Sequence, residues 1–190
     1  LQKVVKWLRK GGPVDALYSA TARAGRPTTE GLLLAAATHG HLEMVRELLK
    51  RGASVDLQTS LGLTALMAAA CHGHLSILLV LLMHSANPDL QDTDGITALT
   101  WAAGGGQEAC VQALLRAKAS TELRTKKGHT ALQYAEIKGH TPSAELIRQH
   151  AAPPQPAPPS SAATPEAGEP TVSSPARLKE VERAGQQASA

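Results

Sequence analysis

One repeating spacing, a period of 33, organises most of the chain. Glycines recur at this spacing in two series, and leucine pairs keep it as well: Gly62, Gly95 and Gly128; Gly40, Gly73, Gly106 and Gly139; and the pairs that begin at Leu48, Leu81 and Leu114. After one intervening residue, Thr-Ala-Leu follows each glycine of the first series. A fixed period of this length is typical of proteins built from stacked units, each of which contacts only its neighbours. The chain is therefore expected to fold as a linear array of similar units.

Each unit carries the signals of two helices and a turn. Thr64 can act as an N-cap, and the helix-favouring residues after it run up to Gly73, which predicts a short first helix. From Leu75 onward, leucines recur at spacings of three and four residues, which indicates the apolar face of a second helix. Pro88 forbids continuation of that helix, and the polar link at 89–95 ends in glycine, as a turn or hairpin does.

These residues resemble the ankyrin repeat, in which a Thr-Pro-Leu-His-x-Ala run opens the first of two antiparallel helices, followed by Gly-His and a Leu-Leu pair. The resemblance covers about residues 1–150, and three full copies at one period make it specific. It implies an all-α fold, an ankyrin-repeat solenoid of paired antiparallel helices with β-hairpin-like loops, followed by a disordered tail. The predicted units are 1–28 (a partial N-terminal repeat and an extended loop), 29–58, 59–91, 92–124 and 125–150 (a C-terminal capping repeat), with the tail at 151–190.

The copies depart from the family pattern at three kinds of position. Gly31 stands where the first full copy should have its capping Thr, which predicts a weakly capped helix. Arg148 replaces the second leucine of the last copy, as expected of a terminal repeat that faces water. The histidine of the family's opening run is replaced in every copy, by Leu34, Met67, Thr100 and Gln133. Hydrogen bonds that this histidine would make in each repeat are therefore in doubt.

The two ends of the chain differ from the regular units. The segment at 1–15 looks like the second helix of a repeat, because Val14 and Asp15 match Val55 and Asp56 at an offset of 41. This offset exceeds the period by eight residues, which we place in an enlarged loop near Ala16–Glu30. At the other end, eight of the twelve prolines lie between 153 and 175, and a stretch of this composition buries too little apolar surface to offset its ordering entropy.

Cysteine usage and hydrophobic length exclude several classes of protein. Cys71 and Cys110 are too few for a disulfide framework and lack Cys-x-x-Cys spacing, which indicates a reducing compartment. We therefore expect an intracellular protein, cytoplasmic rather than nuclear. The longest nearly uncharged apolar stretch, Leu75–Met83, is far shorter than the roughly 20 residues that cross a bilayer, so no membrane insertion is expected.

Three local patterns suggest chemistry but have simpler explanations. The histidines around Gly40 and Gly73 belong to the repeat's own Gly-His turn, and their spacing does not supply four zinc ligands. The run Gly104–Gly106 has no Lys-Ser or Lys-Thr after it, so it indicates a weak helix end rather than a phosphate loop. Cys71 and His72 are adjacent on a helix and do not face each other. We expect no catalytic, cofactor-binding or metal-binding residues, no cofactor, and no small-molecule substrate.

Aromatic residues and charge are distributed unevenly along the array. Trp101 and Tyr134 occupy equivalent positions, where Ala35 and Ala68 stand in the earlier units, and we expect both aromatics to fill part of the core. Residues 1–51 carry nine Lys or Arg against four acids, 52–115 carry none against five, and 116–150 carry seven against three. This banding can orient a charged partner. Nucleic acid is not expected as a partner, because the basic patches are small and lack interleaved aromatics.

By the resemblance, the protein is a non-catalytic protein–protein interaction module, a scaffold or adaptor that binds a partner protein through its concave hairpin and first-helix face. The candidate partner-binding residues lie at hairpin tips and helix ends: Ser60, Leu61, Leu63, Thr93, Asp94, Ile96, Lys126, Lys127 and His129 on the hairpins, and His39, His72, Ile137 and Lys138 on the helices. We expect Leu61, Leu63 and Ile96 to matter most, as exposed apolar side chains. The fold itself does not name the partner.

Two other functions stay open at this point. The repeats can be a regulatory or substrate-recruiting fragment of a larger enzyme, such as a kinase or ubiquitin ligase. They can also be a nuclear transcriptional co-regulator, although the chain has no compact Lys/Arg cluster of the usual import type. In each case we expect the chain to be a monomer on its own.

Overall fold

The computed structural model of the protein describes residue 10 and residues 14–15, 17–21 and 27–151. Its elements, in chain order, are β1 (Leu17–Thr21), β2 (Pro27–Gly31), α2 (Leu32–Thr38), α3 (Leu42–Lys50), α4 (Ala65–His72), α5 (Leu75–Met83), α6 (Ala98–Gly104), α7 (Glu108–Arg116), α8 (Ala131–Lys138) and α9 (Thr141–Ala151). The disordered tail predicted at 151–190 lies outside the described residues from 152 onward, as does most of the predicted partial repeat.

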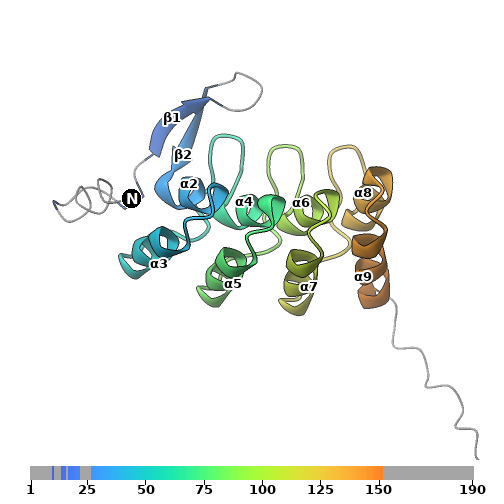
Figure 1. Ribbon diagram of the computed structural model, residues 1–190. Coiled ribbons are helices and arrows are strands. Elements are labelled where there is room, and N and C mark those ends of the chain that lie inside the picture. The colour runs from blue at the N-terminus through green and yellow to red at the C-terminus, as the bar shows by residue number, and fades with distance from the viewer. Residues whose placement is uncertain (1–9, 11–13, 16, 22–26, 152–190) are drawn as a thin grey trace, which may run out of the picture. The chain divides into compact units, whose positions relative to one another are not determined.

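The helices form two layers (Figure 1). In the inner layer α2, α4, α6 and α8 pack side by side, and in the outer layer α3, α5, α7 and α9 do the same. Each inner helix also packs against the outer helix that follows it in the sequence. This arrangement confirms the predicted all-α repeat fold, because each described helix pair packs against the pairs next to it.

Threonine side chains fix where the inner helices begin. Thr64, Thr97 and Thr130 are the N-caps of α4, α6 and α8, and each side-chain oxygen accepts a hydrogen bond from the backbone N–H three residues on. Such a bond satisfies one of the N–H groups left open at a helix start. The predicted weak cap of α2 is confirmed, since its N-cap Gly31 makes no side-chain bond.

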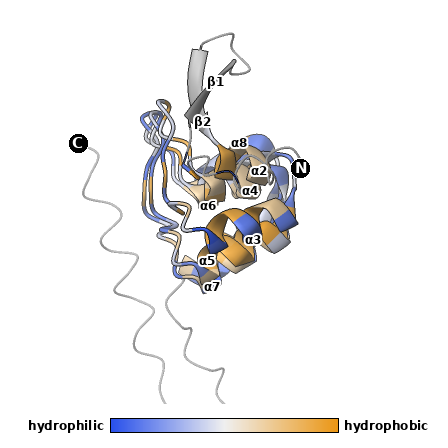
Figure 2. Ribbon diagram, turned by 90° about the vertical axis from the view of Figure 1, so that its left-hand side faces the viewer, coloured by the Kyte–Doolittle hydropathy of each residue, from blue (hydrophilic) through white to orange (hydrophobic). Residues whose placement is uncertain are grey.

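The core lies between the two layers and repeats with the period of the sequence. Equivalent residues are fully buried in successive helix pairs: Ala69, Ala102 and Ala135 in the inner layer, and Leu48, Leu81 and Leu114 in the outer layer. The small alanine side chains let neighbouring inner helices approach closely, while the leucines fill the space between the layers. In the side view of Figure 2, hydrophobic segments of both layers face each other.

A pair of strands precedes α2, where the sequence predicted only an enlarged loop. β1 and β2 pair antiparallel with the register Leu17↔Gly31 to Thr21↔Pro27. Tyr, Thr and Leu favour extended backbone, and Pro27 stands at the first position of β2, where a strand tolerates proline. The enlarged-loop expectation was therefore incomplete at this point, since it weighed the extra length and not this strand composition.

None of the helices within 27–151 has the length and apolar character needed to cross a membrane.

Candidate functional site

Three loops that connect successive helix pairs are stacked beside the inner layer (Figure 2). These loops, at 57–63, 90–96 and 123–129, are held together by backbone hydrogen bonds. The N–H of Thr93 donates to the carbonyl oxygen of Leu61 at 3.0 Å, and the N–H of Lys126 donates to that of Asp94 at 2.8 Å. We call the surface made by these loops the loop face.

A side chain at the start of each loop closes its turn. Asp92 Oδ1 accepts the N–H groups of Asp94 and Ile96, each at 2.9 Å, and Asp92 Oδ2 accepts the indole N–H of Trp101 at 3.2 Å. Thr59 and Thr125 close their turns through Oγ1 in the same way. Both carboxylate oxygens of Asp92 are therefore used in hydrogen bonds within the chain. The side chain of Asp94, the other acid of this loop, is exposed.

Glutamine side chains connect one loop to the next, which the sequence analysis missed. Gln58 Nε2 donates to Gly62 O in its own loop at 2.8 Å and to Gln91 O in the next at 3.2 Å. Gln91 makes the equivalent pair of bonds, to Gly95 O at 2.8 Å and to Arg124 O at 3.0 Å. The signal that could have found these bonds is the spacing of 33 between the two glutamines.

An aspartate ladder makes a second set of connections between neighbouring helix pairs. Asp56 Oδ1 accepts the N–H of Asn87 at 3.0 Å, and Asp89 Oδ1 accepts that of Ser120 at 2.8 Å, both 31 residues away. Asp15 makes the same bond to Ser54, at 3.0 Å and 39 residues away. The larger separation contains the eight extra residues, so Asp15 takes the place in the ladder that Asp56 takes in the next pair.

The side chains of the polar candidates at the loop tips are exposed and take no part in holding the loops. The exposed residues are Ser60, Thr93, Asp94, Lys126 and Lys127. Within the described residues, their side chains make no hydrogen bond or ion pair to another part of the chain. The structure brings these tips together on one face, with Asp94 in the loop stacked against that of Lys126.

The apolar candidates are less exposed than the sequence indicated. Leu61 and Leu63 are half-buried, and Leu63 packs against the core. The expectation that Ile96 is exposed was wrong, because only 9% of it is accessible. Its loop is the middle one of the stack, so that neighbouring loops lie on both sides of it. His129, in the last of the three loops, is half-buried.

The candidates at helix ends form a second group, separated from the loop face by the length of the inner helices. Helices of seven or eight residues are about 12 Å long at 1.5 Å per residue. His39 and His72 are exposed at the ends of α2 and α4, and their Nδ1 atoms lie 2.9 and 3.0 Å from the carbonyl oxygens four residues earlier. Their rings stack on His41 and His74, with ring centres 6.1 and 6.0 Å apart.

At the far end of the array, Ile137 and Lys138 end α8. Ile137 is 61% exposed, and Lys138 Nζ lies 5.9 Å from the centre of the Tyr134 ring, within the range of a cation–π contact. Tyr134 and Trp101 are both half-buried, and Trp101 packs against the core, as predicted. A Cβ built on Gly104 would lie only 2.6 Å from Cδ1 of Tyr134. The absence of a side chain at Gly104 therefore makes room for the Tyr134 ring.

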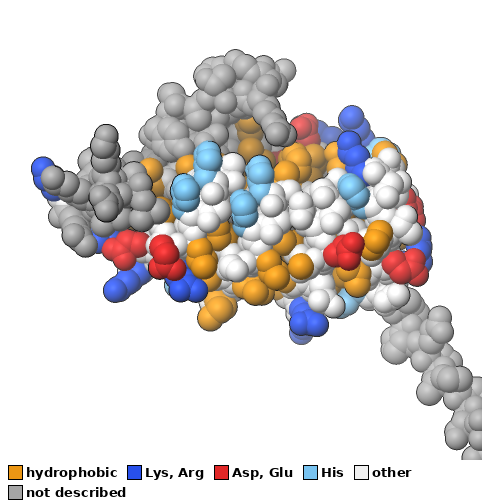
Figure 3. Space-filling model, viewed as in Figure 1, with side chains coloured by type: hydrophobic (Ala, Val, Ile, Leu, Met, Phe, Trp, Pro, Cys, Tyr) orange, Lys and Arg blue, Asp and Glu red, His pale blue; other side chains and the backbone are white. Residues whose placement is uncertain are grey.

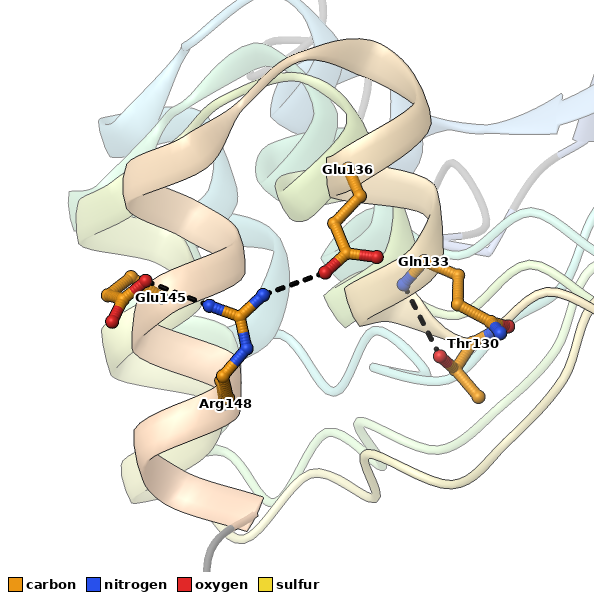
Figure 4. Close-up of polar contacts among 5 residues, drawn as sticks. All are labelled: Thr130, Gln133, Glu136, Glu145 and Arg148. Atoms are coloured by element: carbon orange, nitrogen blue, oxygen red, sulfur yellow. Dashed lines mark hydrogen bonds and ion pairs between the residues drawn. The ribbon is translucent and has the colours of Figure 1, made fainter.

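Polar side chains cap α8 and connect it to α9 in the last helix pair (Figure 4). Thr130 and Gln133 form a capping box at the start of α8. Arg148 donates through Nη2 to Glu136 Oε1 at 2.8 Å and through Nη1 to Glu145 Oε2 at 2.9 Å. All three side chains are about half exposed, so these ion pairs contribute little to stability and keep this end of the array polar.

The described residues contain no group of three or more His, Cys, Asp or Glu side chains placed to hold a metal ion. Neither cysteine is in a disulfide. Cys110 lies in the core, and burial raises the pKa of its thiol. Cys71 is half-buried at the end of α4.

These positions predict unequal thiol reactivity. Because the thiolate is the reactive form and Cys110 is both covered and held protonated, iodoacetamide should modify Cys71 in the native protein and Cys110 only after unfolding. Mass spectrometry of the labelled chain at a mildly alkaline pH checks this. Equal native labelling rates at the two cysteines would contradict the packing of α7.

A comparison with family models matches the chain to ankyrin repeats in three copies, over residues 2–92 and again over residues 78–156. No curated protein shows significant similarity to it. The matched residues span most of the chain and include all the helices described above. The chain therefore belongs to the ankyrin-repeat family.

Proposed function

We propose that the protein is a non-catalytic scaffold or adaptor that binds a partner protein through the loop face. The observation that carries this proposal is a division of roles within each loop. One set of side chains, Gln58, Thr59, Gln91, Asp92 and Thr125, holds the loops in place through hydrogen bonds. The tip side chains point into solvent from this fixed frame.

A rigid frame with exposed tips suits recognition, because little conformational entropy is lost when a partner binds. Asp94 and the pair Lys126 and Lys127 place opposite charges in neighbouring loops. Leu61 and Leu63 add partly exposed apolar surface beside them. The proposed partner therefore carries a basic group opposite Asp94, an acidic group opposite the lysines, and an apolar side chain at the leucines.

The charged pair gives the first test. Lys126→Glu with Lys127→Glu should slow association with a captured partner by on the order of tenfold at low salt and flatten its salt dependence, because exposed interfacial charges act mainly on encounter. Partners are isolated by affinity capture with the full chain, and rates are measured by surface plasmon resonance. Leu63→Asp should instead speed dissociation, since it places an unpaired charge against an apolar contact.

The matched control makes the same change of charge elsewhere. Lys50→Glu with Arg116→Glu alters two exposed cations of the outer layer and should leave both rates of a loop-face partner unchanged. The loop face is excluded if every captured partner binds the Lys126 and Lys127 double variant and the Leu63 variant as it binds the parent.

A further inference from the structure

Helix α5 is apolar on every side, although it lies in the outer layer. Eight of its nine residues are Leu, Ile, Val or Met, and the remaining one is Ser76. A helix that is hydrophobic all round is normally buried on all sides. Here Ile77, Leu78 and Leu81 are buried in the core and Leu75, Val80 and Leu82 pack against it, while the remaining side of the helix faces outward.

Two large side chains of α5 are left exposed on its outer side. Leu79 is 44% exposed and Met83 is 84% exposed. They are four residues apart and therefore lie on one face of the helix. Val80 and Leu82, both half-buried, flank them. We call Leu79, Val80 and Met83 the α5 ridge.

The neighbouring outer helices carry polar residues at the same positions. Arg46 on α3 and Gln112 on α7 each lie one period away from Leu79, and Lys50 and Arg116 each lie one period away from Met83. All four are exposed. The repeat therefore normally places a solvated side chain here, and α5 departs from its neighbours within the same chain. Figure 3 shows hydrophobic side chains on the outer layer between Lys and Arg side chains.

The charges around the α5 ridge are polarised along the helices. Lys50 and Arg116 flank its C-terminal end, and neither forms an ion pair with a carboxylate in the described part of the chain. Lys118, just beyond α7, is also exposed. At the opposite end, Glu43 and Glu108 are exposed in the first turns of α3 and α7.

We propose that the α5 ridge is a second docking surface, distinct from the loop face, and that its occupant is an amphipathic helix of a partner protein. The apolar stripe of that helix covers Leu79 and Met83, and its acidic residues lie against Lys50 and Arg116. Apolar contact supplies affinity, and the two cations select the charge and direction of the bound helix. This inference does not depend on the function proposed for the loop face.

The charge pattern and the oligomeric state together separate this occupant from three others. A second copy whose α5 packs parallel would bring the flanking cations of both copies together, and an antiparallel copy would make the parent sediment as a dimer. A flat anionic bilayer would attract Lys50 and Arg116 but repel Glu43 and Glu108 at the other end. The chain's own tail has one apolar and charged stretch, 177–183, with three basic and two acidic residues, so it offers the wrong net charge.

The test uses the full chain and two synthetic helical peptides of about 18 residues with the same leucine stripe, one flanked by glutamate and one by lysine. Fluorescence anisotropy should show the glutamate peptide binding on the order of tenfold more tightly than the lysine peptide. Met83→Glu should remove that binding, and Leu79→Gln should weaken it independently. Lys50→Glu with Arg116→Glu should reverse the preference between the peptides, which non-specific adhesion would not do.

The matched control is Lys126→Glu with Lys127→Glu, which should leave peptide binding unchanged while it slows capture of a loop-face partner. Circular dichroism should give Met83→Glu and the Lys50 and Arg116 double variant the parent's melting temperature, since these side chains are exposed. The proposal is overturned if Met83→Glu leaves peptide binding intact, if the parent sediments as a dimer that Met83→Glu dissociates, or if only phosphatidylserine vesicles bind. It is also overturned if Leu178→Asp raises peptide affinity, which would make the tail the occupant.

Discussion

Leu81→Ala should lower the free energy of unfolding by about 2–5 kcal/mol, the range found when a buried leucine is truncated and leaves a cavity. Leu81 is fully buried in α5, between the layers. The inner-layer helices are already closely packed through their alanines. The surrounding helices therefore have little freedom to close the cavity that the truncated Leu81 side chain leaves. Urea denaturation followed by circular dichroism measures the change.

Leu79→Ala is the matched control, because it makes the same chemical change two residues away on the same helix. Leu79 is 44% exposed, and its truncation should cost less than about 1 kcal/mol. Equal losses of stability from the two variants would mean that α5 is rotated from the orientation described here. The pair also separates stability from docking, since only the Leu79 change removes part of the α5 ridge.

Much of the fold could be predicted from the sequence because the period carries it. Each position recurs 33 residues later in an equivalent environment. The helix starts and buried positions assigned in one repeat can therefore be assigned in the others. The caps at Thr64, Thr97 and Thr130 and the burial of Leu81 follow from local rules applied at that period. The missing cap at Gly31 follows from the same rules.

The contacts between loops could not be predicted in the same way, because they depend on how closely the units stack. Gln58 and Gln91 look like ordinary surface residues until the next loop places a carbonyl oxygen within 3.2 Å of each. The burial of Ile96 has the same origin, since an isolated hairpin would leave this side chain in water. The sequence therefore suggested the loop tips as the candidate site, while the contacts of its residues depend on the stacking.

That stacking also connects the loop face to the core. The backbone bonds from Thr93 to Leu61 and from Lys126 to Asp94 fix the distance between tips, and the loops run directly into the N-caps of α4, α6 and α8. A change that separates two loops should therefore weaken partner binding even when it touches no tip side chain.

Gly62→Ala should be such a change, with a loss of stability on the order of 3 kcal/mol. Gly62 has a φ of +74°, which L residues adopt only at a cost. In addition, a Cβ at this position would lie 2.8 Å from Asp92 Cα and 3.0 Å from Thr93 N in the next loop. These are backbone atoms that no side-chain rotation can move away, so the loops must separate and the bond from Thr93 to Leu61 must lengthen.

Gly128→Ala distinguishes the two causes of this loss. Gly128 is the equivalent glycine of the last loop and has a φ of +81°, but no atom lies within 4 Å of a Cβ built there. Its substitution should cost only the backbone term, about 1–2 kcal/mol, and leave the loop stack intact. Urea denaturation of both variants, with capture of a loop-face partner as the second readout, should show the larger loss and weaker capture for Gly62→Ala. If the two variants lose equal stability, the close stacking of the loops at Asp92 and Thr93 is not what constrains Gly62.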